Sequence, residues 1–191
     1  MGKATIAKAW TEAELQALPE AGYRHEVVNG ELILSPKDNW FHGRICTRLL
    51  FALEGFNRLH RLGAVLDSST GFWMQNRNCR APDISFVSKA RIESLAFSPL
   101  AEQFFPGAPD LAVEILSEGN TRSEINARLK DFFESGTQLA WVVHPGQKRV
   151  EVCHSPTDRK MIGSGGLLEG EHLLPGFKFA IEDLFKEWDW E

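Results

Sequence analysis

The chain has 191 residues, 43% of them hydrophobic and 25% charged, a composition typical of a soluble globular protein with a sizeable core. Its net charge of −5 argues against a general nucleic-acid coat protein, and no apolar run approaches the roughly 20 residues that span a bilayer. The three cysteines lie far apart and the first ten residues contain no apolar signal segment, so we expect reduced thiols, a cytoplasmic location and no membrane partner.

The first predicted elements are a short helix and a hairpin. Thr11 and Glu14 have the spacing of a capping box, so a helix should begin there and end near Pro19. Two apolar runs then surround Asn29-Gly30, a strong signal for a tight turn. The pattern therefore predicts a β-hairpin over residues 24–34.

A long helix follows the hairpin. Over residues 39–62 apolar side chains recur at 3.6-residue intervals, and His42 lies on the same buried stripe at one end. A histidine in such a position is more often a satisfied core residue than a ligand, unless other functional groups lie beside it. Both interpretations of His42 remain open at this stage.

Strands and helices alternate through the rest of the chain. A second capping box, from Thr121 to Glu124, predicts a helix that ends near Ser135, with Gly136 as its C-terminal stop. Residues 88–107 have an irregular or partly helical pattern. The predicted strands are 64–67, 71–75, 82–87, 109–116, 139–144, 149–154 and 177–179, and a last short helix covers 181–185.

Interleaved strands and helices predict an α/β (α+β) fold in which a mixed β-sheet is flanked by helices. No repeat, low-complexity stretch or linker divides the chain. We therefore expect a single domain over residues 1–191, with an N-terminal helix and hairpin in 1–37 and the core in 38–191.

Two of the predicted strands carry acidic residues at positions that alternate with apolar ones. Asp83 precedes one apolar run, while Asp110 and Glu114 share a strand face with Ala112 and Leu116, so that face should be covered. Buried carboxylates are costly unless a cation neutralises them, and Mg²⁺ does so with oxygen ligands. We therefore expect Asp83, Glu114 and Asp110 to hold Mg²⁺ (or Mn²⁺) for phosphate chemistry. The alternative is a set of solvent-facing acids on a half-exposed sheet.

Two further side chains are candidates for the same site. On a helical wheel Arg128 lies about 40° from Phe132, on the flank of the apolar face, whereas Lys130 points away from the core. Arg128 either reaches the carboxylates or extends to a surface acid. Glu31, just after the hairpin turn, either joins the acidic cluster or is a surface charge, and the two interpretations are about equal.

An ordered set of segments carries a family resemblance that covers the chain from Trp10 to Phe185. The segments are Thr11-Glu12-Ala13-Glu14-Leu15, Tyr23-Arg24-His25-Glu26-Val27-Val28-Asn29-Gly30-Glu31-Leu32, Ser35-Pro36, Pro82-Asp83-Ile84, Pro109-Asp110-Leu111-Ala112-Val113-Glu114-Ile115-Leu116-Ser117, Asn120-Thr121-Arg122, Asp131-Phe132-Phe133 and Val142-Val143-His144-Pro145. In this order they resemble the PD-(D/E)XK restriction-endonuclease-like superfamily, and more closely its small bacterial Uma-two-type endonuclease family, long catalogued as a domain of unknown function.

The resemblance implies a restriction-endonuclease-like core and a metal-dependent endonuclease that hydrolyses phosphodiester bonds of nucleic acid, with DNA as the expected substrate. Asp83 and Glu114 would hold the Mg²⁺, which would acidify a water for attack, and a homodimer would suit cleavage of both strands. The superfamily's lysine, two residues beyond the glutamate, is Leu116 here, and the small family supplies it from the next helix, where this chain has Arg128.

That arginine is the main departure from the family pattern. Arginine stays protonated and cannot act as a base. A second departure is His144, which stands where relatives usually carry aspartate. The alternative function is therefore a catalytically silent module of the same fold that binds nucleic acid or protein.

Overall fold

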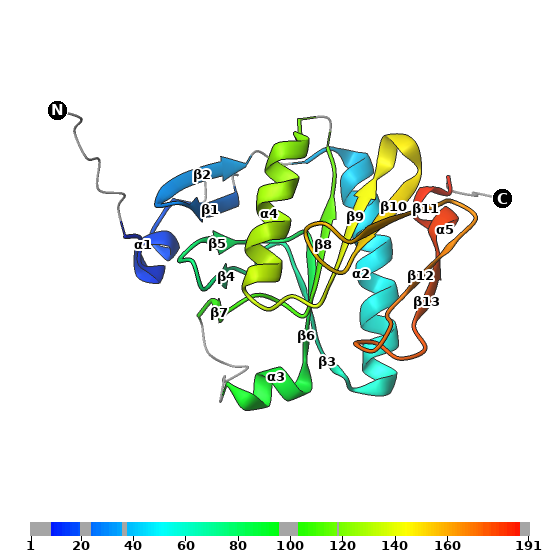
Figure 1. Cartoon of the computed structure of the whole chain (residues 1–191), viewed down its shortest axis with the longest axis horizontal. Helices are drawn as coiled ribbons and strands as arrows, with labels where there is room; N and C mark the ends of the chain where they lie inside the picture. The colour runs from blue at the N-terminus through cyan, green and yellow to red at the C-terminus, as the bar shows by residue number, and fades with distance from the viewer. Residues whose placement is uncertain (1–8, 20–23, 36–37, 96–102, 118, 188–191) are drawn as a thin grey trace.

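A six-stranded mixed sheet lies at the centre of the molecule (Figure 1). The structure is a computed structural model that describes residues 9–19, 24–35, 38–95, 103–117 and 119–187. Strands β8 and β9 are parallel, and every other pair in this sheet is antiparallel. In spatial order its strands are β11 (Arg159–Gly163), β10 (Arg149–Cys153), β9 (Leu139–His144), β8 (Leu111–Ile115), β6 (Ile84–Ser88) and β3 (Gly63–Asp67).

Two smaller sheets and the helices surround this centre. The five-stranded sheet has the order β2 (Glu31–Ser35), β1 (Arg24–Val28), β5 (Cys79–Arg80), β4 (Phe72–Trp73) and β7 (Phe105–Pro106). The third sheet pairs β12 (Leu167–Glu169) with β13 (Lys178–Ala180). The helices are α1 (Glu12–Gln16), α2 (Trp40–His60), α3 (Lys89–Ser94), α4 (Arg122–Glu134) and α5 (Ile181–Phe185), with a 3₁₀ turn over Pro145–Gln147.

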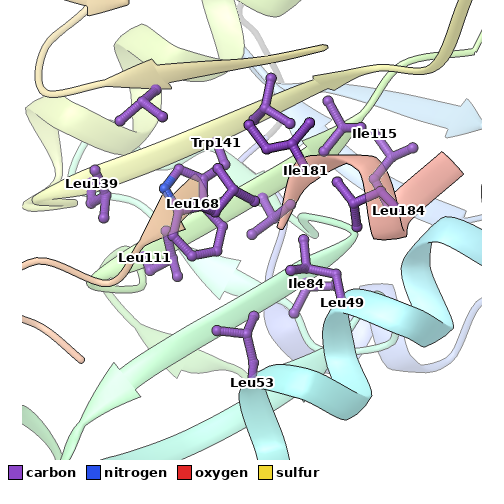
Figure 2. Packing of buried hydrophobic residues seen from close by; sticks show 14 of the residues in the cluster. Leu49, Leu53, Ile84, Leu111, Ile115, Leu139, Trp141, Leu168, Ile181 and Leu184 are labelled. Atoms are coloured by element: carbon purple, nitrogen blue, oxygen red, sulfur yellow. The ribbon is translucent and has the colours of Figure 1, made fainter. Parts of the chain in front are cut away.

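Helices α2 and α4 cover opposite faces of the central sheet (Figure 1). On the α2 face, Leu49 and Leu53 pack with Ile84 and Trp141, and α5 closes the same core (Figure 2). On the α4 face, the neighbouring strand positions contribute small side chains such as Ala112. The predicted alternation of the two acidic strands is thereby confirmed, and each face receives its own helix.

The capping boxes and the hairpin turn that the sequence predicted are present in the structure. Both capping boxes are present, since Thr11 and Thr121 each accept a backbone N–H three residues on. Asn29 and Gly30 both have positive φ angles (52° and 82°), as a tight hairpin turn with the strand twist requires. The predicted fold class is correct, and within the described ranges no helix combines the length and apolarity needed to cross a bilayer.

The sheet is more divided than the sequence predicted. Strands β5 and β7 have two residues each, too short to show alternation, and the expected strand 71–75 forms only over β4. Strand β11 is an edge strand in which Lys160 and Met161 are exposed, so its sequence pattern resembles that of a polar loop. The hairpin β1–β2 consequently belongs to a second sheet, and side chains of β1 reach the carboxylates of the central sheet and Arg128 of α4.

Candidate active site

The two acidic residues that the sequence singled out come together where the sheets meet. Asp83 directly precedes β6 and Glu114 lies in β8, and these strands are antiparallel neighbours with Ile84 opposite Val113. Continuing this register by one residue places Asp83 beside Glu114. Both side chains are buried, since Asp83 is 2% and Glu114 6% exposed. Two carboxylates thus enter the protein interior from adjacent strands.

Asp83 is bound from three directions. Its Oδ1 accepts a hydrogen bond from Arg24 Nη1 at 2.6 Å, and its Oδ2 accepts one from the backbone N–H of Ile115 at 2.7 Å. His42 Nε2 lies 3.2 Å from the same Oδ2. Burial alone would raise the pKa of Asp83, but the bond with His42, the positive charges of His42 and Arg24, and the Ile115 amide lower it. Asp83 is therefore ionised.

His42 occupies the first turn of α2, directly beside these acids. The side chain of Asn39 caps the helix by accepting the His42 N–H at 2.9 Å, which fixes that turn. The Nε2 atom lies 3.7 Å from Asp38 Oδ2, and burial, which lowers the pKa of His42, is outweighed by the bond with Asp83 and by both acidic charges. One ligand atom each from Asp38, His42 and Asp83 lies within 4.8 Å of the others. The sequence left the role of His42 open, and the structure places it among functional groups.

Arg128 of α4 joins Glu114 to a second buried acid, Glu26 of β1. Its Nε and Nη2 both lie 2.9 Å from Glu114 Oε1, while Nη1 donates to Glu26 Oε2 at 2.6 Å and Nη2 to the Ala81 carbonyl at 3.2 Å. Burial raises the pKa of Glu114 to about 7, although the charge of Arg128 pulls it down. One guanidinium thus serves two carboxylates and leaves Glu114 incompletely neutralised.

Glu26 also receives support from β5. Its Oε1 accepts the Ala81 N–H at 2.8 Å, and Arg80 Nη1 lies 3.5 Å from its Oε2. Burial raises the pKa of Glu26, but Arg128, Arg80 and this amide bring it below its usual value. Arg80 in turn donates to Asp131 of α4 at 2.6 and 2.8 Å, and Asn78 donates to both oxygens of Asp131 at 3.0 Å. A buried polar network therefore fixes α4 against the second sheet.

The structure does not bring Asp110 to this site. Asp110 precedes β8, four residues before Glu114, which corresponds to about 13 Å along an extended strand. Its carboxylate accepts bonds from the Ser88 N–H (2.8 Å), Arg91 (2.9 Å) and Gln138 (2.8 Å). Burial raises its pKa, but these donors lower it overall. The expected metal ligand thus lies in a separate cluster with its own cation, because residues on one face of a strand need not share one site.

Glu31 and Lys130 also lie away from the carboxylates. Glu31 is exposed and pairs with Val28 beside the hairpin turn, while Arg24 lies at the opposite end of the same hairpin. Glu31 is therefore placed as a surface charge rather than with the cluster. Lys130 is 62% exposed, as the helical wheel predicted, and it pairs with Glu134 at 2.6 Å.

Three residues of the site were not singled out from the sequence: Arg24, Glu26 and Asp38. Arg24 and Glu26 lie within a segment that carries the family resemblance, and their alternation with Val27 places two charged side chains on one strand face. The two-residue spacing of Arg24 and Glu26 was the sequence signal that could have identified them as site residues. Asp38 lies four residues before His42, which is the one hint that both belong to the same helix end.

A cavity of about 330 Å³ opens beside His42. It is lined by Asn39, Phe41, His42, Leu116, Ser117 and His144, and by the turn from Pro145 to Gln147. The His144 imidazole lies 4.0 Å from Glu151, and burial lowers its pKa. The cavity gives the α2 side of the site access to solvent.

The comparisons with known proteins identify the family and the fold. Residues 12–182 match the family model Uma2, described as "Putative restriction endonuclease". Among solved structures, a protein from Anabaena variabilis, described as "a putative nuclease belonging to DUF820", is 22% identical, with a TM-score of 0.79 over 92% of this chain and 97% of that chain. No curated protein matches the chain. The match over most of the chain confirms the predicted family: this protein belongs to the Uma2 family of restriction-endonuclease-like proteins.

Proposed function

We propose that this protein is a metal-dependent endonuclease that hydrolyses phosphodiester bonds of nucleic acid, with DNA as its substrate. The observation that supports the proposal best is the pair of buried carboxylates, Asp83 and Glu114, on neighbouring strands. Family membership supports a nuclease-like function. The residues present also fit a divalent cation, because Glu114 is buried with only a share of one guanidinium to neutralise it.

Asp83 and Glu114 would hold Mg²⁺ or Mn²⁺ through their oxygens. The bound ion would polarise the phosphate and acidify a water at neutral pH. Among the described residues, Arg128 contacts Glu114 at Oε1 alone, which leaves Oε2 for the cation. Arg24 contacts Asp83 from the exposed side of the site, where the nucleic-acid backbone would approach.

Arg128 stands where the family places a lysine, and its surroundings define what it can do. Its three nitrogens contact Glu114, Glu26 and the Ala81 carbonyl, so the guanidinium is fixed in place. Arginine keeps its proton and can only stabilise negative charge. We therefore expect slow hydrolysis in the native chain.

The test is cleavage of supercoiled plasmid DNA by the full chain with Mg²⁺ or Mn²⁺. Glu114→Gln should abolish cleavage, because it removes a ligand charge at nearly constant size, whereas Glu134→Gln on the exposed side of α4 is the matched control and should leave the rate unchanged. Arg128→Lys should raise the rate, because lysine is compact and is the family's residue at this place.

The second candidate is a catalytically silent module, which the fixed and permanently charged Arg128 favours. Wild type and Glu114→Gln cleaving equally would assign the activity to a contaminant. No cleavage by wild type or Arg128→Lys, together with retained DNA binding, would establish the silent module. Sedimentation with and without DNA would show whether the chain acts as the dimer that double-strand cleavage suits.

A further inference from the structure

The start of α2 and the residue before β6 bring one imidazole nitrogen and two carboxylate oxygens close together. Asp38 and His42 are four residues apart across the cap residue Asn39, whose side chain fixes the turn by accepting the His42 N–H. His42 Nε2 lies 3.7 Å from Asp38 Oδ2 and 3.2 Å from Asp83 Oδ2. His42 and Asp83 are buried, and Asp38 closes the group on the exposed side.

These separations suit a small cation. For ligand distances of about 2.1 Å, separations of 3.2 and 3.7 Å correspond to ligand–metal–ligand angles of about 100–125°, near tetrahedral. His154 shows the contrast, since it also contacts two acids, but Glu171 lies at its Nε2 (2.8 Å) and Asp158 at its Nδ1 (3.9 Å). Ligands on opposite ring nitrogens cannot share one ion, whereas at His42 both acids lie on the Nε2 side and the three ligand atoms are within 4.8 Å of one another.

The donor set also selects the metal. An imidazole nitrogen suits borderline cations such as Zn²⁺ and Co²⁺, while Mg²⁺ and Ca²⁺ prefer oxygen alone. Three protein ligands would leave a fourth position open, as in many sites that exchange ligands with solvent. The cavity lined by Asn39 and His42 gives an ion and its remaining ligand a route in.

A guanidinium now bridges the two acids. Arg24 Nη1 donates to Asp83 Oδ1 at 2.6 Å and its Nη2 to Asp38 Oδ2 at 2.9 Å. One positive charge thus lies between the carboxylates that a divalent ion would use. The Arg24 side chain is 29% exposed, so it can move to solvent when its place is taken.

We propose that Asp38, His42 and Asp83 form a binding site for Zn²⁺ or a cation of similar character, separate from the Asp83–Glu114 position, and that the ion displaces Arg24 from Asp38. The proposal shares only Asp83 with the proposed function and holds whether or not the chain cleaves DNA. Arg24 then acts as a built-in competitor that sets the affinity for the ion.

The experiment is a Zn²⁺ titration of the full chain at fixed pH against a colorimetric chelator. His42→Gln and Asp38→Asn should each weaken binding at least about tenfold, the cost typical of disturbing a metal site. Arg24→Gln should strengthen binding severalfold, because it removes the competing charge. His154→Gln is the matched control and should bind as wild type does. Circular dichroism of each variant checks the fold, and the absorption of Co²⁺ bound to wild type reports a near-tetrahedral nitrogen–oxygen site without any substitution.

Glu114→Gln separates this proposal from the proposed function. We expect it to keep wild-type zinc affinity while losing cleavage. If Glu114→Gln loses zinc and Asp38→Asn does not, the ion binds at Asp83–Glu114, so the proposed nuclease site stands and the Asp38–His42–Asp83 site is overturned. Equal affinity of wild type, Asp38→Asn and His42→Gln, or a Co²⁺ spectrum of six-coordinate type, overturns it as well.

Discussion

Replacing Arg128 by methionine should destabilise the metal-free protein strongly and in a pH-dependent way. The guanidinium is the shared cation of Glu114 and Glu26, which are 6% and 3% exposed. Removing one partner of a buried ion pair costs about 3–5 kcal/mol, because a charge remains buried without compensation. Arg80 lies 3.5 Å from Glu26 and still supports that acid. The uncompensated group in Arg128→Met is therefore chiefly Glu114.

The pH dependence follows from the direction of the pKa shift. Burial already raises the pKa of Glu114 from its usual value of about 4.5 to about 7, and loss of Arg128 raises it further. A carboxyl whose folded pKa exceeds its unfolded pKa takes up a proton on folding, so stability falls as pH rises between the two values. The cost of Arg128→Met should thus be about 3–5 kcal/mol at pH 8 and clearly smaller at pH 5.

Urea unfolding of wild type and Arg128→Met at pH 5 and pH 8, with a chelator present, measures the loss of stability and its dependence on pH. Adding Glu114→Gln to Arg128→Met should restore part of the loss at pH 8, since the amide carries no charge to bury. Glu114→Gln alone should change stability little, because Glu26 still pairs with Arg128. An equal cost at both pH values, or a cost below about 1 kcal/mol, would refute the claim that this guanidinium neutralises the buried acids.

Two other substitutions test features of the scaffold. Asp110→Asn should cost about 2–4 kcal/mol, because the carboxylate accepts bonds from Arg91, Gln138 and the Ser88 N–H. The folded pKa of Asp110 is lowered, so its stabilisation is present above the unfolded pKa and is lost as pH falls through the folded value. An acid-unfolding midpoint of the variant equal to that of wild type would contradict this. Gly136→Ala should cost about 1–3 kcal/mol, because φ is +107° and the added Cβ would lie 2.9 Å from Arg91 Nη2; a thermal melt unchanged from wild type would show that the backbone relaxes there.

The sequence predicts the elements that depend on local signals. The two capping boxes, the Asn29-Gly30 turn and the last helix at 181–185 all lie where the pattern places them. The capping boxes are specified by side chains three residues from the backbone groups that they bond, and the turn by two residues that tolerate positive φ angles. Strands β5 and β7 escape prediction because two-residue strands have no period, and their pairing is decided by segments far away in the chain.

The site is predicted only in part, for the same reason. Asp83, Glu114 and Arg128 could be named because they interrupt apolar strands or flank an apolar helix face, and the structure brings them to one region. Arg24 and Glu26 contact them from another sheet, across 59 and 102 residues of sequence. No periodicity encodes such pairs. Asp110 lies on the same strand face as Glu114, but tertiary contacts with Arg91, Gln138 and Ser88 place it in a separate cluster.

The ion pairs that join strand β1 to the rest of the protein also affect how the protein folds. Arg24–Asp83 and Arg128–Glu26 join segments far apart in the chain, and such contacts require a large loss of chain entropy before they form. Where such contacts form only after the folding transition state, weakening them accelerates unfolding and leaves the folding rate nearly constant. The charges at the candidate site would thereby determine how long each molecule stays folded, while the hydrophobic core sets how quickly it folds.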